Sequence, residues 1–252
     1  LGVPDMTYAY VSSPVLYKKL LLVQHDQSDE KAALVAFDTE TGKEVWRTKR
    51  KMGASWCSPI IIETEKGAQA ILVSCGGVAS YDPKDGHEIW SVRNECNDIV
   101  PSPAFSKGLV IVTTGKSTFA IRPDGTGDVT KTHVAWRNEE AGSDVASPVA
   151  GGDMVFVVST SVLCLSAADG KKIGECEVEG QIYASPVIAG GKLYLVNRDG
   201  AVAVVKADKT LEVLGKASFG EHFDATPAVS GGCLYVRTLK KLICIAPAQQ
   251  QP

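Results

Sequence analysis

The sequence predicts an all-β protein, a β-propeller built from four-stranded antiparallel blades. Three observations lead to this prediction. A Ser/Thr-Pro pair followed by an apolar run recurs six times along the 252 residues, at intervals of 38 to 45 residues. Between these pairs, short β-branched apolar runs alternate with Gly- and Asp-containing turns, a pattern typical of strands. No helical periodicity extends over ten or more residues, and a repeat of about 40 to 45 residues has the size of a propeller blade.

The Ser/Thr-Pro pairs mark where each blade begins. They are Ser13-Pro14, Ser58-Pro59, Ser102-Pro103, Ser147-Pro148, Ser185-Pro186 and Thr226-Pro227. Proline cannot donate to a sheet ladder, so we expect it to open the innermost strand, whose free edge faces the central channel. We interpret residues 1–252 as a single propeller domain with six visible repeats.

Each unit then continues in the same order. A tight polar turn separates the first two strands, for example at Lys107-Gly108 and Gly190-Gly191. The third strand ends in a turn such as Asp38 to Gly42, where the glycine is expected to have a positive φ. In the third unit this turn contains an insertion, Asp124 to Asp128 (DGTGD), which we expect to be a surface loop; a weak calcium site there is an alternative.

Two columns of the aligned repeats predict how the blades pack. The third-strand column holds small residues, as expected where blade faces blade: Ala36, Ser80, Ala120, Cys164, Val204 and Cys244. The fourth-strand column reads Trp46, Trp90, Trp136, Gly174 and Leu214. An indole ring there would lie across the neighbouring blade and bury roughly 150–250 Å². Because the column loses its bulk toward the C-terminus, we expect looser packing between the last blades.

The sixth unit stops after its third strand, which leaves two interpretations of the ring. Residues Leu1 to Met6 align with part of the missing fourth strand and would close a six-bladed ring by covering an open edge. Alternatively, the chain is the C-terminal part of a propeller with seven or eight blades. Residue 1 is Leu, so we expect the natural start to have been removed or to lie upstream.

Composition excludes several classes of function. The net charge is −3 and no basic run is longer than Thr48 to Lys51, so nucleic-acid binding has no electrostatic footprint. The apolar runs are strand-sized, far below the roughly 20 residues of a transmembrane helix. The seven cysteines show neither CxxC nor metal-ligand spacing. We expect them to be small core residues, with room for one disulfide.

The repeat resembles that of the pyrroloquinoline-quinone (PQQ) repeat β-propellers, which reads small-[Ser/Thr]-Pro, two strands, then Ala-x-Asp-x-x-Thr-Gly-x-x-x-Trp. The best matches are ALVAFDTETGKEVW (Ala33 to Trp46) and VASYDPKDGHEIW (Val78 to Trp90). The resemblance covers essentially the whole chain and is strongest to the secreted PQQ-like repeat proteins of bacteria and to the outer-membrane-assembly lipoproteins. It implies an extracytoplasmic location, periplasmic or secreted.

The same resemblance implies more than one function, because fold does not fix function. Quinoprotein dehydrogenases of this kind hold PQQ under a Cys-Cys disulfide, beside a calcium ion and a catalytic Asp. This sequence has no Cys-Cys pair. Other relatives bind no quinone and act as scaffolds. We therefore expect a non-enzymatic scaffold without a cofactor. The alternatives are an oxidoreductase that binds PQQ with calcium and a ligand-sensing module of a larger receptor.

The loops from each fourth strand to the next first strand carry the candidate binding residues. Such loops lie on one face of a propeller, around the channel mouth, and loops on a rigid scaffold are where function concentrates. The candidates are the aromatic, acidic and histidine side chains Tyr8, Tyr10, Trp56, Asp98, Asp144, Tyr183, His222, Phe223 and Asp224. We expect this acidic and aromatic face to bind a protein partner or an extended ligand.

A plainer interpretation of the same loops stays open. The acids would then be solvated only, and the aromatic rings that precede the Ser/Thr-Pro pairs would plug the channel mouth as core. His222 lies between Glu221 and Asp224, yet a lone histidine among loop acids is usually neither a base nor a metal ligand. There is no GxSxG motif, and the repeat serines are structural. We assign no catalytic residue and no metal ligand.

Overall fold

The structure is a computed structural model that describes residues 11–26, 31–51, 53–94 and 99–246. These residues form strands and turns only, in six sheets, which confirms the all-β prediction. Among them there is no helix, and hence none that is long and apolar enough to cross a membrane.

The first three blades span the N-terminal half. Blade 1 contains β1 (Val15–Tyr17), β2 (Leu20–His25), β3 (Ala33–Asp38) and β4 (Glu44–Lys49). Blade 2 contains β5 (Ile60–Thr64), β6 (Gly67–Ser74), β7 (Gly76–Tyr81), β8 (Glu88–Asn94) and the later strand β12 (Gly127–Asp128). Blade 3 contains β9 (Ala104–Ser106), β10 (Leu109–Thr113), β11 (Thr118–Ile121) and β13 (Val134–Asn138).

The last three blades follow the same plan. Blade 4 contains β14 (Val149–Gly151), β15 (Met154–Val158), β16 (Ser161–Ser166) and β17 (Lys172–Glu177). Blade 5 contains β18 (Val187–Ala189), β19 (Lys192–Val196), β20 (Ala201–Lys206) and β21 (Val213–Ser218). Blade 6 contains β22 (Ala228–Ser230), β23 (Cys233–Arg237) and β24 (Leu242–Ile245).

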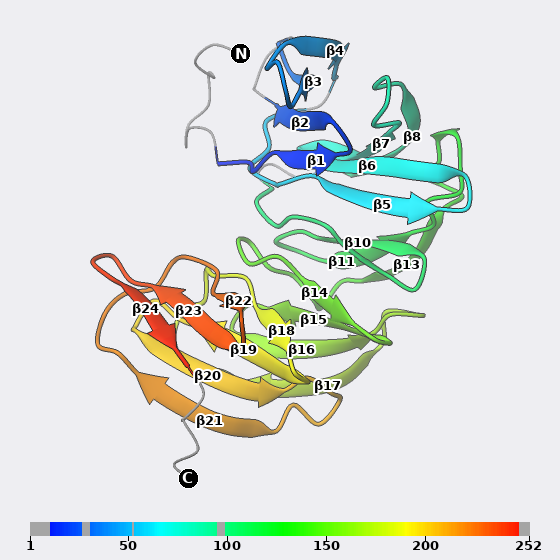
Figure 1. The fold of residues 1–252 in the computed structure, drawn as a ribbon. Helices are drawn as coiled ribbons and strands as arrows, with labels where there is room; N and C mark the ends of the chain where they lie inside the picture. Colours follow the sequence, from blue (N-terminus) through cyan, green and yellow to red (C-terminus); the bar gives the residue numbers. More distant parts are fainter. Residues whose placement is uncertain (1–10, 27–30, 52, 95–98, 247–252) are drawn as a thin grey trace.

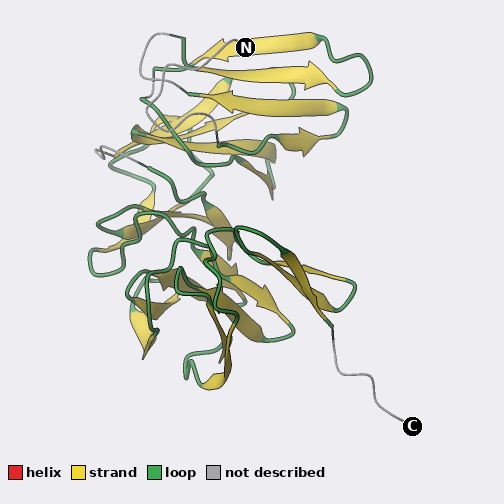
Figure 2. Ribbon diagram, turned by 90° about the vertical axis from the view of Figure 1, so that its left-hand side faces the viewer, coloured by secondary structure: helices red, strands yellow, loops and turns green. Residues whose placement is uncertain are grey.

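The blades follow one another in chain order along a curve (Figure 1). Blade 1 lies at one end and blade 6 at the other, and both views show these two blades apart (Figure 2). In the part of the chain that the structure describes, blade 6 has three strands, and no strand of blade 1 pairs with it. The ring closure by Leu1 to Met6 falls outside the described residues and stays a prediction.

The Ser/Thr-Pro pairs open the innermost strands as predicted, since all six begin at the residue directly after the proline. The structure also shows why a hydroxyl precedes it. The backbone N–H of Ser13 donates to Ser58 Oγ of the next blade at 2.9 Å. The same bond, at 2.9 to 3.1 Å, joins the pairs Ser58–Ser102, Ser102–Ser147, Ser147–Ser185 and Ser185–Thr226. A line of hydrogen bonds therefore links consecutive blades along the inner strands.

The residues of the two packing columns are paired with each other in the register of the third and fourth strands. Ala36 is opposite Trp46, Ser80 opposite Trp90 and Ala120 opposite Trp136. In each of the first five blades, a register shift directly follows the small residue. This irregularity corrects one alignment: the residue opposite Val204 is Gly215, not Leu214.

The expectation of looser packing at the C-terminal end is wrong for the interface between blades 4 and 5. No ring occupies the position of Gly174, but the carbonyl of Lys209 in the next blade approaches it so closely that a Cβ would overlap that oxygen. Backbone therefore replaces the indole ring there. At Gly215 of blade 5 a Cβ would meet nothing within 4 Å, so this position is open.

The insertion in blade 3 is also more than a surface loop. Its residues Gly127–Asp128 form β12, which pairs in parallel with the outer strand β8 and gives blade 2 a fifth strand. The next residue, Val129, is 3% exposed and belongs to the core cluster that contains Trp90. Asp128 forms an ion pair of 3.2 Å with Arg93 of β8. The insertion thus covers the edge of the neighbouring blade.

A buried ion pair at the end of blade 1 is hydrogen-bonded to blade 2, and no local sequence pattern indicates it. Arg50 Nε lies 2.6 Å from Asp26 Oδ1, and both side chains are 0% exposed. Arg50 also donates to Ser74 Oγ at 2.6 Å, and that hydroxyl donates to Asp26 at 2.5 Å. A charge is tolerated in such a place only when it is paired and hydrogen-bonded.

The cysteines divide into core and surface residues. Among the described residues, no two cysteines form a disulfide with each other. Cys57 and Cys164 are buried, as expected for small core residues, and burial raises the pKa of the Cys164 thiol to about 11. Cys244 is exposed, in contrast to the packing role expected for it, because no fourth strand of blade 6 lies among the described residues. Cys96 lies outside the described residues.

Candidate binding face at the channel mouth

One end of the blades gathers the connecting loops, and we call it the channel-mouth face. It comprises the loops between blades, which include residues 139–148, 178–186 and 219–227. The turns between second and third strands lie at the same end, including 114–117, 159–160 and 197–200. Hydrogen bonds join the two kinds of segment, for example from Ser143 N to Thr114 O at 2.9 Å.

Two predicted aromatic residues of this face are part of the core. Trp56 is 8% exposed, and its backbone N–H donates to Ile99 O at 3.1 Å. Phe223 is 0% exposed and packs edge-on against Phe219, with ring centroids 5.8 Å apart. Both rings therefore fill the space under the loops, as the plainer interpretation describes. Tyr8, Tyr10 and Asp98 lie outside the described residues.

Three of the predicted residues, Tyr183, His222 and Asp224, come together around an arginine that sequence reasoning missed. Arg198 Nε lies 2.9 Å from Asp224 Oδ1 and 3.0 Å from His222 Nε2. Its guanidinium carbon lies 4.3 Å from the centroid of the Tyr183 ring. His222 Nε2 also lies 3.1 Å from Asp224 Oδ1.

A glutamine completes the group, which we call the arginine cluster: Gln181, Tyr183, Arg198, His222 and Asp224. Gln181 Oε1 accepts a hydrogen bond from Arg198 at 3.1 Å, and Gln181 Nε2 donates to the Tyr183 hydroxyl at 3.3 Å. The five side chains come from three segments of blades 4, 5 and 6. Several bonds therefore fix Arg198 and Tyr183 relative to each other.

A buried asparagine positions Arg198. Asn197 follows β19, and its Oδ1 accepts the backbone N–H groups of Asp199 and Ala201 at 3.1 and 2.8 Å. Its Nδ2 donates to Glu179 O at 2.7 Å, which ties the turn to the neighbouring loop. In the sequence, NRDG (residues 197–200) follows an apolar strand and predicts a turn. The sequence does not indicate that the Arg198 side chain points toward the connecting loops on either side, 178–186 and 219–227.

The channel-mouth face is less acidic than its composition suggests, because several of its carboxylates are paired. Glu179 lies 2.8 Å from Lys216 Nζ, and Glu221 lies 2.7 Å from Lys241 Nζ. The hydrogen bond from Lys241 holds the pKa of Glu221 below its usual value. Asp224 pairs with Arg198. Among the described ion pairs, Asp144 takes no part.

Asp144 and Tyr183 line a cavity of about 390 Å³ beside the arginine cluster. The cavity lies among the loop after β13, the turn between β15 and β16, and the loop after β17. Its lining consists of Ser143, Asp144, Val145, Ser159, Thr160, Gly180, Gln181, Ile182 and Tyr183. Its volume falls in the lower part of the range of known small-ligand sites.

A larger cavity, of about 690 Å³, lies at the opposite end of the blades. It is formed by turns of blades 2 and 3 and includes the partly exposed ring of Phe105. Its cationic side chains already have partners: Lys66 Nζ donates to Asp124 O at 2.7 Å, and Lys107 pairs with Asp153 at 2.5 Å. This cavity therefore offers fewer free polar groups than its size suggests.

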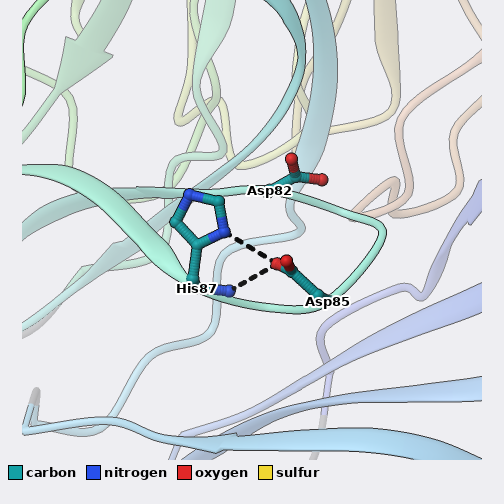
Figure 3. A group of neighbouring side chains, drawn as sticks. All are labelled: Asp82, Asp85 and His87. Atoms are coloured by element: carbon teal, nitrogen blue, oxygen red, sulfur yellow. Dashed lines mark hydrogen bonds and ion pairs between the residues drawn. The ribbon is translucent and has the colours of Figure 1, made fainter.

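One group of potential metal ligands also lies away from the channel-mouth face. Asp82, Asp85 and His87 bring one ligand atom each to within 4.8 Å of one another in the turn between β7 and β8 (Figure 3). Asp85 Oδ1 lies 2.8 Å from His87 Nδ1, and Asp82 Oδ1 accepts the N–H of Lys84 at 2.8 Å. These contacts stabilise the turn itself.

Comparison with known proteins places this fold. The family model described as "Outer membrane protein assembly factor BamB" matches residues 5–173 and 132–214. The crystal structure of BamB from Moraxella catarrhalis is similar, with a TM-score of 0.74, 13% identity, and coverage of 98% of this chain and 73% of that chain.

A second solved structure, the computationally designed Ika8 protein, has a TM-score of 0.73 and 11% identity, with 96% of this chain and 73% of that chain covered. No curated protein matches the sequence. The two structural similarities show the fold alone, whereas the family model covers most of the sequence. The chain therefore belongs to the BamB-like family of PQQ-like repeat β-propellers.

Proposed function

We propose that this chain is a non-enzymatic scaffold that binds a protein partner through its channel-mouth face. The observation that carries the proposal is the arginine cluster beside the cavity of about 390 Å³. Side chains that are already held in one geometry lose little freedom on binding, which favours affinity and specificity. The cluster joins two successive connecting loops through the turn that carries Arg198, so a partner that contacts it spans more than one blade.

The family supports a protein as the partner. Its description names an outer membrane protein assembly factor. An assembly factor acts on other proteins, and we extend this role to the present chain as part of the proposal. The same description supports the proposed extracytoplasmic location.

A quinone with calcium finds little support in the described residues. The one tryptophan of the connecting loops, Trp56, is buried in the core and presents no ring face for stacking. The group Asp82, Asp85 and His87 lies at the other end of the blades from the arginine cluster, and its atoms hold a turn. Among the described residues, neither Trp56 nor this group fits a quinone site.

Site-specific photo-crosslinking from the two ends of the blades tests the proposal. A photoreactive amino acid replaces Gln181 on the channel-mouth face or, as the matched control, Lys107 at the opposite end; both positions are exposed. The full-length protein is expressed in its native host, irradiated, and analysed for protein adducts. We expect a discrete adduct from position 181 and none from 107. Adducts from position 107 alone, or from neither position, would contradict the proposal.

A further inference from the structure

We propose that the cavity beside Tyr183 is a pocket for a guanidinium group, the side chain of an arginine on the partner protein. This inference rests on the proposed function and specifies the chemistry of the partner at the same face. It depends on three features of the cavity: its charge, the backbone contact that places Asp144, and the hydroxyl-bearing residues of its lining.

The charge of the cavity comes from a single side chain. Asp144 is the only carboxylate in the lining, and the lining contains no Lys, Arg or His. Asp144 is exposed and takes part in none of the ion pairs found among the described residues. Arg198 lies beside this lining, but it is paired with Asp224 at 2.9 Å. The one charged side chain of the lining itself therefore favours a cationic ligand. A free carboxylate can accept two parallel hydrogen bonds from a guanidinium, a geometry that an ammonium cannot match.

Two glycines leave the room that this carboxylate occupies. A Cβ on Gly115, in the turn between β10 and β11, would overlap Asp144 Oδ1. A Cβ on Gly142 would lie 2.6 Å from Gly115 O, so the loop and the turn approach each other backbone to backbone. The hydrogen bond from Ser143 N to Thr114 O, at 2.9 Å, closes the contact. The backbone that carries Asp144 is thus held against the turn, and Asp144 lines the cavity without an ion-pair partner among the described residues.

The remaining lining suits the other donors and the stem of an arginine. A guanidinium has five N–H donors, so a carboxylate alone leaves some of them without an acceptor. Ser143, Ser159 and Thr160 line the same cavity, and a hydroxyl group can accept such a hydrogen bond. Val145 and Ile182 add apolar surface for the methylene groups.

Tyr183 lines the pocket and is held in place by two neighbours. Arg198 covers one face of its ring, and Gln181 donates to its hydroxyl. The phenol proton therefore remains free to point elsewhere, and the ring cannot swing away without loss of these contacts. Because Arg198 already lies over the ring, we assign charge recognition to Asp144 and treat Tyr183 as a stacking wall.

Titration of the full chain with short peptides tests the pocket. The probes are acetyl-Gly-Arg-Gly-amide and its counterpart with citrulline, a neutral analogue of arginine, followed through backbone amide shifts of residues 143–145 and 180–183. The variants are Asp144→Asn, which removes the charge, and Gly115→Ala, which displaces the carboxylate. Glu140→Gln removes the same charge from an exposed position of the same loop outside the cavity and serves as the control.

We expect the arginine peptide to bind, and citrulline and Asp144→Asn each to weaken binding about tenfold or more, the usual effect of losing a charged hydrogen bond. Gly115→Ala weakens it as well, and Glu140→Gln changes it less than twofold. Equal binding of arginine and citrulline, or equal binding by wild type and Asp144→Asn, would overturn the pocket. Binding of a neutral sugar such as cellobiose, without binding of the arginine peptide, would also overturn the pocket.

The crosslinking experiment separates this inference from the proposed function. A crosslinked partner at position 181 together with no arginine binding leaves the scaffold function intact and rejects the guanidinium pocket. Arginine binding without any adduct from position 181 rejects a protein partner at this face, and with it the claim that the arginine belongs to one.

Discussion

The indole ring of Trp136 in blade 3 lies directly against Gly170 in blade 4. A Cβ on Gly170 would overlap the ring, and Trp136 Nε1 donates to Ala167 O of the same turn at 3.0 Å. Trp46 of blade 1 makes the same contact with blade 2, where a Cβ on Gly86 would lie 2.5 Å from the Cε3 atom of Trp46. The glycine that ends this turn thus has two reasons to be glycine, its positive φ and the ring above it.

Replacement of these glycines separates the two reasons. Gly42 and Gly170 have nearly the same φ, 69° and 70°, but a Cβ on Gly42 would meet nothing within 4 Å. We expect Gly42→Ala to lower the free energy of unfolding by about 1 kcal/mol, from backbone strain alone. Gly170→Ala should cost about 2–4 kcal/mol, because overpacking adds to the strain. Urea unfolding measures both, and equal losses would argue against the ring contact.

The hydrogen bonds between inner strands predict a second stability effect. Ser102→Ala leaves the backbone N–H of Ser58 without its acceptor at 2.9 Å, so we expect a loss of about 1 kcal/mol. Ser102→Thr keeps the hydroxyl, as Thr226 does in the last blade, and should lose much less. The exposed Ser230 supplies the control, and Ser230→Ala should stay within about 0.5 kcal/mol. A threonine variant as unstable as the alanine variant would count against this role.

The turn that lies over Gly174 predicts a dependence of stability on acid pH. Hydrogen bonds from Thr210 and Lys206 lower the pKa of Asp208 from 3.8 to about 2. Because the pKa is lower in the folded state, the charged carboxylate stabilises the fold above about pH 4. This stabilisation is lost as the pH falls toward 2.

The variant Asp208→Asn isolates this contribution. Wild type and variant are unfolded with urea at several pH values between 5 and 2. The difference between their free energies of unfolding should shrink steadily as the pH falls through this window. A difference that stays constant would show that the carboxylate charge does not hold the turn.

Titration with PQQ, with and without calcium, tests the absence of a redox cofactor. A ligand at about 100 times its dissociation constant adds about 2.7 kcal/mol of stability, which thermal unfolding detects easily. We expect no shift in melting temperature and no dye reduction with alcohols or sugars. A calcium-dependent upshift accompanied by dye reduction would make the protein a quinoprotein oxidoreductase.

Most of the fold could be predicted from the sequence because the repeat contains residues with strong preferences for a backbone conformation. Proline fixes where the innermost strands begin, and glycine marks the turns with positive φ, such as that of Gly170. The insertion and the last interfaces could not be predicted in this way. The pairing of β12 with β8, and the approach of the Lys209 carbonyl to Gly174, depend on the neighbouring blade and leave no local pattern.

The candidate site could be predicted only in part, for a similar reason. The sequence indicates which loops share a face, and this was enough to name Tyr183, His222 and Asp224. It does not indicate which side chains turn inward, so the prediction includes Phe223 with His222 and Asp224 although Phe223 belongs to the core. The prediction does not include Arg198, because this residue lies in a turn between second and third strands and the prediction rests on the loops between blades.

The dissociation constant of the crosslinked partner, measured for two variants, tests most directly the claim that the channel-mouth face is the binding face. Tyr183→Ala removes a wall of the cavity on that face, and Phe105→Ala removes a ring from the cavity at the opposite end. We predict that Tyr183→Ala weakens binding about tenfold or more and that Phe105→Ala changes it less than twofold. A loss of binding with Phe105→Ala, while Tyr183→Ala binds as wild type, would contradict the account.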